Sequence, residues 1–234
     1  MRFIVGVFGK AGSGKSYLIQ SIMDDLPRPV FIVDSQAEFN TGVQFETADE
    51  LLSFLIEGRP NVSGIYVLNS TTDLDFDTFF RILATAQDPA TVVIDEADLF
   101  CTPYNINPDL ARIIKYGRHW KQHIVYAARR PAEVNRNLTA QSDCLISFKQ
   151  TEPRDIAALK KSYAEAEALA ELDETNYECM ILGRYEHLPF SDFLEGRALT
   201  KTVPDSSFQY REPEDPEDED LSSTEEPKPS TDNE

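Results

Sequence analysis

A glycine-rich stretch near the N-terminus restricts what this chain can fold into more than any other feature. Residues 9–16 read Gly-Lys-Ala-Gly-Ser-Gly-Lys-Ser, which fits the phosphate-binding loop pattern Gly-x-x-x-x-Gly-Lys-Ser/Thr. Such a loop needs a buried strand before it and a helix after it, because main-chain amides of both loop and helix surround the phosphates. The context fits: residues 3–8 are an apolar run, and residues 16–25 have helical spacing.

Each residue type in this loop has a physical role. Glycine lets the backbone approach phosphate closely, Lys15 is expected to reach the β- and γ-phosphates, and the Ser16 hydroxyl is expected to ligate magnesium. The sequence therefore predicts ATP and Mg²⁺ as cofactors. The expected nucleotide contacts are Gly9, Lys10, Ala11, Gly12, Ser13, Gly14, Lys15, Ser16 and Tyr17.

Apolar runs bounded by turn residues alternate with segments of helical spacing along most of the chain. This alternation predicts an α/β fold of the P-loop NTPase type, a mostly parallel sheet flanked by helices on both faces. The expected strands are residues 3–8, 30–33, 62–68, 91–94, 123–127, 144–148 and 179–182. The last of these could form a hairpin with the segment after Tyr185. The expected helices are residues 16–25, 48–56, 75–86, 153–172 and one that Asn107 caps.

The net charge of −19 is unevenly distributed. Residues 204–234 carry twelve acidic side chains, two basic ones and five prolines, and have few large apolar residues with which to form a core. We therefore expect a P-loop ATPase domain over residues 1–203 and an acidic, Pro-rich, disordered tail over residues 204–234. No apolar run approaches the roughly 18 residues of a membrane span, no signal peptide is recognised, and three cysteines without CxxC spacing suit an intracellular protein.

An acidic pair forms the second motif. Asp95 and Glu96 directly follow the apolar run Val-Val-Ile at residues 92–94, and the carboxyl end of a buried strand is where sheets of this kind place catalytic groups. We expect Asp95 to hold magnesium together with Ser16, and Glu96 to polarise the attacking water as a general base. Asp34, at the end of another strand, is expected to be a turn residue.

Between Asp109 and Arg136 the chain is basic. Seven lysines and arginines are opposed there by two acids. One of these arginines could reach the γ-phosphate of a neighbouring subunit, the residues could bind nucleic acid phosphates, or they could form a solvated helix face. The seven are Arg112, Lys115, Arg118, Lys121, Arg129, Arg130 and Arg136.

The order of these motifs resembles that of the FtsK/HerA superfamily of DNA-pumping ATPases. Among these, the chain is most similar to the genome-packaging ATPases of tailless, membrane-containing double-stranded DNA viruses. The similarity extends through residues 1–190, and its most specific part is residues 116–155. That part contains Tyr-Gly-Arg-His at 116–119, Ala-Ala-Arg-Arg-Pro-Ala-Glu at 127–133, Leu-Thr-Ala-Gln-Ser-Asp at 138–143 and Pro-Arg-Asp at 153–155.

The resemblance implies a RecA/FtsK-HerA-like sheet and a hexameric ring that threads double-stranded DNA into a capsid. The implied partners are DNA, further copies of the chain and capsid or portal/membrane proteins, in the host cytoplasm and at the packaging vertex of the virion. Besides Lys15 and Glu96, it implies catalytic arginines, with Arg118 or Arg130 as the finger that acts in trans. Many members carry a polar sensor, often Gln, where this chain has Arg129, so either Arg129 senses the γ-phosphate or sensing occurs elsewhere.

Other P-loop proteins remain as alternatives. A filamentous-phage-type assembly ATPase would resemble this domain but usually carries a membrane anchor. A small-molecule or nucleotide kinase would not need the pair Asp95-Glu96 and would typically have an Arg-rich lid, which the sequence does not show. No Asn-Lys-x-Asp-like signature of a GTPase is present, and a nucleotide-dependent switch without turnover would not need Glu96.

Overall fold

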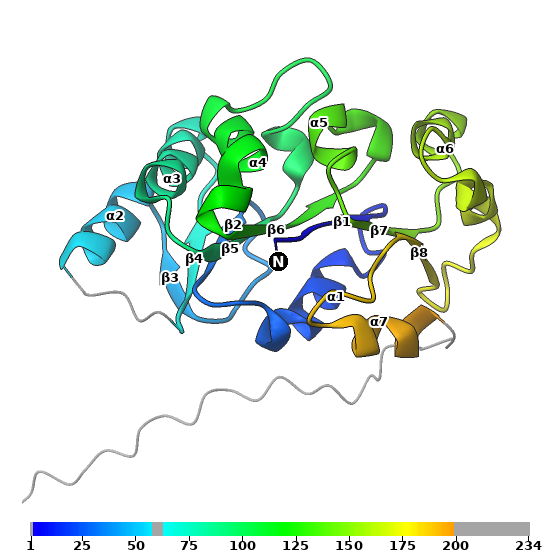
Figure 1. Ribbon diagram of the computed structural model, residues 1–234, viewed down its shortest axis with the longest axis horizontal. Coiled ribbons are helices and arrows are strands. Elements are labelled where there is room, and N and C mark those ends of the chain that lie inside the picture. The colour runs from blue at the N-terminus through cyan, green and yellow to red at the C-terminus, as the bar shows by residue number, and fades with distance from the viewer. Residues whose placement is uncertain (1, 58–62, 199–234) are drawn as a thin grey trace, which may run out of the picture. The chain divides into compact units, whose positions relative to one another are not determined.

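A single eight-stranded sheet, in the order β3-β4-β2-β5-β6-β1-β7-β8, forms the centre of the protein (Figure 1). The structure is a computed structural model that describes residues 2–57 and 63–198. All neighbouring strands pair in parallel except β7 and β8, which are antiparallel. The mostly parallel sheet predicted from the sequence is therefore confirmed. The predicted tail, residues 204–234, lies outside the described residues.

The strands agree closely with the apolar runs of the sequence. They are β1 (Ile4–Phe8), β2 (Val30–Asp34), β3 (Val43–Phe45), β4 (Ile65–Asn69), β5 (Ala90–Ile94), β6 (Gln122–Ala128), β7 (Cys144–Phe148) and β8 (Cys179–Gly183). The α-helices are α1 (Lys15–Ser21), α2 (Ala48–Glu57), α3 (Asp73–Ala86), α4 (Pro108–Trp120), α5 (Arg136–Thr139), α6 (Pro153–Lys160) and α7 (Ser191–Ala198). As expected, Asn107 caps α4, since its Oδ1 accepts hydrogen bonds from the amides of Asp109 and Leu110 at 3.0 and 2.9 Å.

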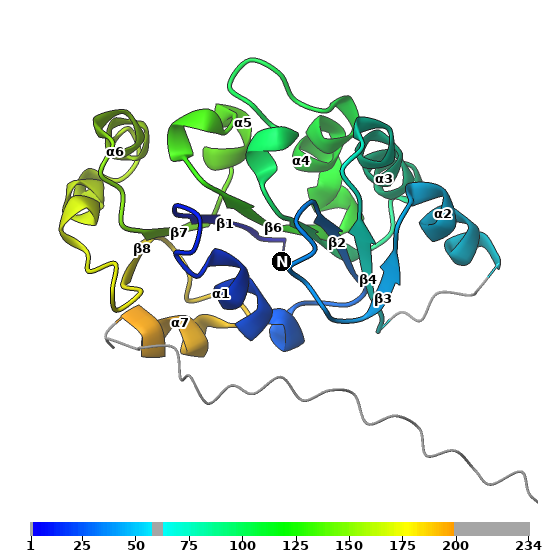
Figure 2. The ribbon, with the colours of Figure 1, turned by 180° about the vertical axis from the view of Figure 1, so that it is seen from behind.

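Helices cover both faces of the sheet, as predicted. Helices α2 to α6 lie on one face, and α1 and α7 lie on the other (Figures 1 and 2). The pleat of each strand sends alternate side chains into the two layers. In β1, Ile4 and Phe8 join the core under α2 to α6, whereas Val5 and Val7 join the core under α1 and α7. A strand buried on both faces must be apolar throughout, which explains its continuous hydrophobic run.

Two predicted elements are wrong. The expected helix over residues 153–172 is α6 followed by a separate 3-10 stretch, Ala164–Glu171, because Tyr163 between them has extended backbone angles (φ −136°, ψ 102°). The segment after Tyr185 is a turn followed by α7 and adds no strand to a hairpin. Leu169 of the first segment and Phe190 of the second are buried in the core, and local spacing does not report such contacts.

Other departures are small. The first helix ends at Ser21, and a 3-10 turn, Met23–Asp25, replaces its expected last part. The strand expected over residues 62–68 runs from Ile65 to Asn69, and residue 62 lies outside the described part. The short strand β3 and the one-turn helix α5 were not predicted, since three or four residues carry too little periodicity to recognise.

The parallel pairing brings the carboxyl ends of β1, β2, β5, β6 and β7 to one edge of the sheet. Strand β6 lies between β1, which leads into the glycine-rich loop, and β5, which leads into the acidic pair. Open α/β sheets bind ligands at this edge. Both sequence motifs therefore end on the same side of the molecule, separated by the width of one strand.

The close approach of β1 and β6 at Gly6 leads to a stability prediction. A β-carbon at Gly6 would lie 2.4 Å from Cζ of the fully buried Tyr126 and 2.9 Å from Cδ2 of Leu145. We expect Gly6→Ala to lower the free energy of unfolding by about 1–3 kcal/mol through overpacking, as measured by urea denaturation. Gly196→Ala on α7 is the matched control, because its β-carbon would meet nothing within 4 Å. Equal stability of the two variants would contradict the packing described at Gly6.

Candidate nucleotide-binding site

The glycine-rich loop joins β1 to α1, and two of its glycines are required for different reasons. Gly14 precedes α1 with φ 96° and ψ 15°, a left-handed conformation that L side chains rarely adopt. At Gly9, a β-carbon would lie 2.3 Å from Oγ of Ser13 and 3.0 Å from Cβ of Phe148. Glycine is thus required at Gly14 by the backbone angles and at Gly9 by the closeness of the loop to itself and to β7.

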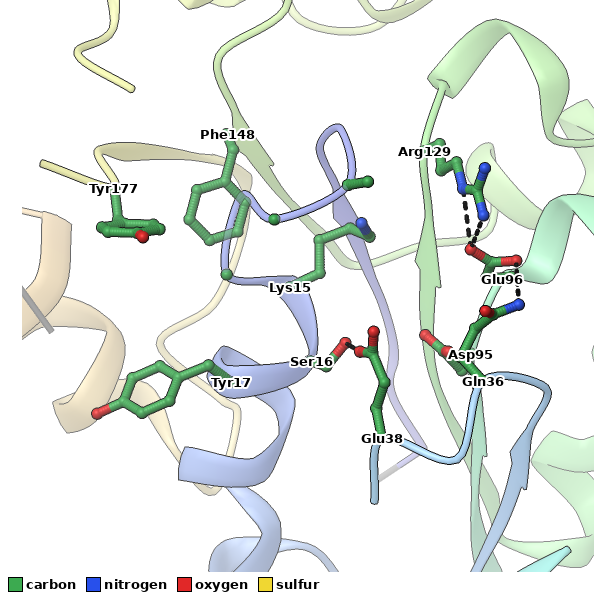
Figure 3. A pocket seen from close by; sticks show the side chains of 13 residues that line it. Lys15, Ser16, Tyr17, Gln36, Glu38, Asp95, Glu96, Arg129, Phe148 and Tyr177 are labelled. Atoms are coloured by element: carbon green, nitrogen blue, oxygen red, sulfur yellow. Dashed lines mark hydrogen bonds and ion pairs between the residues drawn. The ribbon is translucent and has the colours of Figure 1, made fainter. Parts of the chain in front are cut away.

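Lys15 lies across the inside of this loop. Its side chain is mostly buried, and Nζ donates a hydrogen bond to the carbonyl oxygen of Lys10 at 3.2 Å. Burial lowers the pKa of Lys15, while the carboxylates of Asp95, Glu38 and Glu96 act in the opposite direction and favour the charged form. In Figure 3 the amine points toward the acidic side chains on the other wall of the cavity. The lysine is therefore placed to neutralise phosphate charge there.

Asp95, which follows β5, is the buried member of the acidic pair. Its side chain is only 3% exposed. Burial and the nearby carboxylates of Asp34, Glu38 and Glu96 raise the pKa of Asp95 to about 7, although Lys15 opposes this shift. Carboxylates crowded in this way form an environment in which a bound cation is favoured.

Ser16 and Asp95, the two predicted magnesium ligands, face the same cavity. The donor set suits Mg²⁺, which is usually bound through one or two carboxylates and completes its shell with water and phosphate oxygens. Among the residues that the structure describes, no group of three or more His, Cys, Asp or Glu side chains is arranged to hold a metal ion by itself. Ser16 Oγ instead contacts the carboxylate of Glu38.

Glu96 is held by its surroundings. Its Oε1 accepts hydrogen bonds from Nε of Arg129 at 2.9 Å and from Nη2 of the same guanidinium, and its Oε2 lies 3.5 Å from Nε2 of Gln36 (Figure 3). Hydrogen bonding to Glu96 raises the pKa of Arg129. The backbone of Glu96 is left-handed (φ 49°, ψ 56°), a strained conformation for a residue other than glycine. Such outliers persist where the surrounding structure holds a side chain in a particular place.

Two further polar residues of the site, Gln36 and Glu38, were missed in the sequence. They lie in the loop after β2, which Asp34 shapes as a buried turn residue by accepting hydrogen bonds from the amides of Gln36 at 3.1 Å and Phe39 at 2.8 Å. Gln20 of α1 also donates to the carbonyl oxygen of Glu38 at 2.8 Å. Their position just after a predicted parallel strand was the signal that could have identified them.

Together these residues line a cavity of about 420 Å³, a size that suits a small ligand. Phe148, at the end of β7, and Tyr177, in the loop before β8, line it as well and were not predicted. No local pattern identified them. The lining residues are Ala11, Gly12, Gly14, Lys15, Ser16, Tyr17, Gln36, Glu38, Asp95, Glu96, Arg129, Phe148 and Tyr177.

Several predicted site residues lie outside this cavity. Gly9 is packed against β7, while Lys10 and Ser13 line a neighbouring hollow in which Lys10 contacts the carboxylate of Glu174. Arg130 binds a different acid: its Nε donates to Oδ2 of the buried Asp155 at 2.9 Å. This ion pair joins the end of β6 to α6 within one subunit, so the structure does not present Arg130 as a free finger.

Arg118 is exposed on the last turns of α4. Lys121, the residue after α4, leads directly into the first residue of β6, so this end of the helix lies near the amino end of that strand. The glycine-rich loop and the acidic pair lie at the opposite, carboxyl edge. Arg118 is therefore far from the cavity of its own chain, whereas Arg129 lines it.

Comparison with known proteins bears on the fold. No protein-family model matches the sequence, and comparison with curated proteins found no match. Among solved structures, the genome packaging NTPase B204 from Sulfolobus turreted icosahedral virus 2, in complex with AMP, is 21% identical over 77% of this chain and 92% of its own, with a TM-score of 0.61. B204, the DNA-packaging ATPase from Sulfolobus turreted icosahedral virus, is 19% identical over 79% of this chain and 98% of its own, with a TM-score of 0.60. The chain therefore has the α/β P-loop NTPase fold seen in these packaging NTPases.

Proposed function

We propose that this chain is an ATP-hydrolysing DNA translocase that packages a viral double-stranded DNA genome into a capsid as a ring oligomer. The observation that carries the ATPase part is the arrangement of one cavity. Its first wall carries the glycine-rich loop with Lys15 and Ser16, and its second wall carries Asp95, Glu96 and Arg129. A phosphate-binding wall opposite a carboxylate base is what hydrolysis of a phosphoanhydride requires.

In the proposed reaction, the loop amides and Lys15 bind the β- and γ-phosphates. Ser16 and Asp95 would hold Mg²⁺, which supplies neutralising charge to those phosphates. Glu96 takes a proton from the attacking water, whose oxygen bonds to the γ-phosphorus while the bond to the β,γ-bridging oxygen breaks. The products are ADP and inorganic phosphate. Both hydrogen bonds from Arg129 to Glu96 go to Oε1, so their release would free that oxygen and make the carboxylate a stronger base toward the water.

Arg129 gives the site a means of responding to the γ-phosphate. Its guanidinium binds the carboxylate of Glu96. A γ-phosphate carries more negative charge than one carboxylate and offers several acceptor oxygens, so it competes for the same guanidinium. We therefore assign to Arg129 the sensing role that a polar residue has in the resembled family, with the release of Glu96 as its consequence.

The DNA-packaging part of the proposal rests on the family resemblance and on the fold shared with B204. Two surface features agree with it. Arg118 cannot serve its own cavity, so an active role for it requires a neighbouring subunit in a ring. The exposed side of α4 also carries Lys115, Tyr116 and His119 around Arg118, a basic and aromatic surface suited to phosphate or subunit contacts.

The proposed partners are double-stranded DNA, further copies of the chain and capsid or portal/membrane proteins, with action in the host cytoplasm and at the packaging vertex. None of the helices in the described ranges is both long enough and apolar enough to cross a bilayer. The net charge of −9 that remains on residues 1–203, after the tail's −10 is taken from −19, does not prevent DNA binding. A ring can concentrate its basic residues toward a central channel.

Steady-state ATP hydrolysis with and without double-stranded DNA tests the proposed function. We expect DNA to stimulate hydrolysis at low salt and the stimulation to decline as salt rises, because phosphate contacts displace counterions. Lys15→Ala is the control that shows the activity belongs to this site. Hydrolysis indifferent to DNA, in conditions where the ring assembles, would contradict the translocase and favour a kinase or partner-activated switch.

Glu96→Gln tests the base. The amide keeps the size of the side chain but cannot accept a proton, so we expect turnover to fall by about 100-fold or more while ATP binding persists. Single-turnover hydrolysis and equilibrium ATP binding measure the two effects separately. Glu57→Gln, which changes an exposed carboxylate on α2, is the matched control. Normal turnover of Glu96→Gln would remove Glu96 from the mechanism.

Arg129→Gln tests γ-phosphate sensing. We expect ATP affinity to fall by about threefold to tenfold and ADP affinity to stay unchanged, because only ATP offers the third phosphate to this partly exposed guanidinium. Calorimetric titrations with each nucleotide measure the ratio. Arg112→Gln is the control, since Arg112 binds Asp109 on α4 at 2.9 Å, away from the cavity. If Arg129→Gln still discriminates ATP from ADP as the unaltered protein does, sensing occurs elsewhere.

A further inference from the structure

The cavity has two chemically different ends. Lys15 points toward the charged end, where Asp95, Glu96 and Arg129 lie (Figure 3). The lining of the opposite end is aromatic and consists of Tyr17, Phe148 and Tyr177. In Figure 3 the Tyr17 side chain extends from α1 away from the acidic wall, toward the side on which Tyr177 lies. In a bound nucleotide, the phosphates would therefore lie among charged side chains and the nucleoside among aromatic ones.

The aromatic end begins at the last glycine of the loop. A β-carbon placed on Gly14 would lie 3.4 Å from Cδ1 of Tyr177 and 3.6 Å from Cζ of Phe148, so both rings border the point where the loop becomes α1. Phe148 is only 3% exposed and fills the space between the loop and β7. Tyr177 is half-buried and Tyr17 is 38% exposed. The two tyrosines are thus the members that can still offer ring surface to a ligand.

The turn that carries Tyr177 is held firmly. The carboxylate of Asp173 accepts hydrogen bonds from the amide of Thr175 at 2.8 Å and from Nδ2 of Asn176 at 2.7 Å. Glu174 of the same turn contacts Lys10 of the glycine-rich loop. Tyr177 itself has φ 52°, a left-handed angle that costs a tyrosine free energy. This turn, residues 173–178, therefore fixes the ring beside the loop.

We propose that Tyr177 and Tyr17 form the base-binding part of the site and hold the purine of ATP by stacking, with Phe148 supporting the loop beside them. The inference rests on the proposed function, because it takes ATP as the ligand. Lys15 and the acidic pair place the γ-phosphate at the charged end, so the nucleoside extends to the aromatic end. Planar bases stack on aromatic rings in a way that adds to simple burial of area.

Comparing ATP with tripolyphosphate separates base binding from phosphate binding, because tripolyphosphate has the phosphates and no base. In Tyr177→Ala and Tyr17→Ala we expect ATP affinity to fall by about threefold to tenfold and tripolyphosphate affinity to stay unchanged. Lys15→Ala should weaken both ligands. Tyr104→Ala, which alters a tyrosine that is 93% exposed and outside the cavity, should weaken neither.

Tyr177→Leu distinguishes loss of the aromatic ring from loss of folding. Leucine retains apolar bulk and is as strained as tyrosine in the left-handed backbone conformation. Its thermal unfolding midpoint should match that of the unaltered protein, and its ATP affinity should fall as in Tyr177→Ala. Equal weakening of ATP and tripolyphosphate would show that Tyr177 only positions the loop and would overturn the proposal, as would unchanged ATP affinity. If the unaltered protein binds tripolyphosphate but not ATP, the base site is refuted. If it binds neither ligand, the proposed ATPase function itself fails.

Discussion

Parallel pairing of the central strands is the constraint on which the site depends. Main-chain hydrogen bonds place Phe8 opposite Ala128, and Ile94 opposite Tyr126, so β1, β5 and β6 end at nearly the same level. Glu96 lies two residues after β5 and Arg129 one residue after β6, and the two side chains consequently meet. A register shift of one residue would turn every side chain of the shifted strand to the other face of the sheet. The ion pair between these two side chains is therefore a consequence of the backbone ladder.

The electrostatics of the cavity are those of a site built for an anion together with a cation. Lys15 and Arg129 offset some of the negative charge of the three carboxylates that line the cavity. Burial and the neighbouring carboxylates nevertheless raise the pKa of Asp95. Charged groups excluded from water interact strongly. Repulsion between the carboxylates therefore favours binding of a cation beside them. A triphosphate bound with Mg²⁺ would bring negative charge to Lys15 and Arg129 and positive charge to the carboxylates. The arrangement thus links nucleotide binding to the state of Glu96.

The basic stretch that looks continuous along the chain is divided among different tasks in three dimensions. Arg129 lines the nucleotide cavity, Arg130 forms an ion pair with buried Asp155, and Arg118 lies on α4 toward the other edge of the sheet. Consecutive residues after a strand point in different directions, so Arg129 and Arg130 have different partners although they are neighbours. A run of basic residues in a sequence therefore does not indicate which of them binds a phosphate.

Residue types and spacing within short segments are sufficient to predict the glycine-rich loop, the pair Asp95-Glu96 and the mostly parallel α/β sheet. Three contacts became visible only in the folded chain: Arg129 binds Glu96, Glu38 reaches Ser16 and Tyr177 borders the loop. The tertiary structure also divided the segment expected as one helix over residues 153–172. These features depend on contacts between residues far apart in the chain, whose partners are set by strand order and burial, and local periodicity carries no information about either.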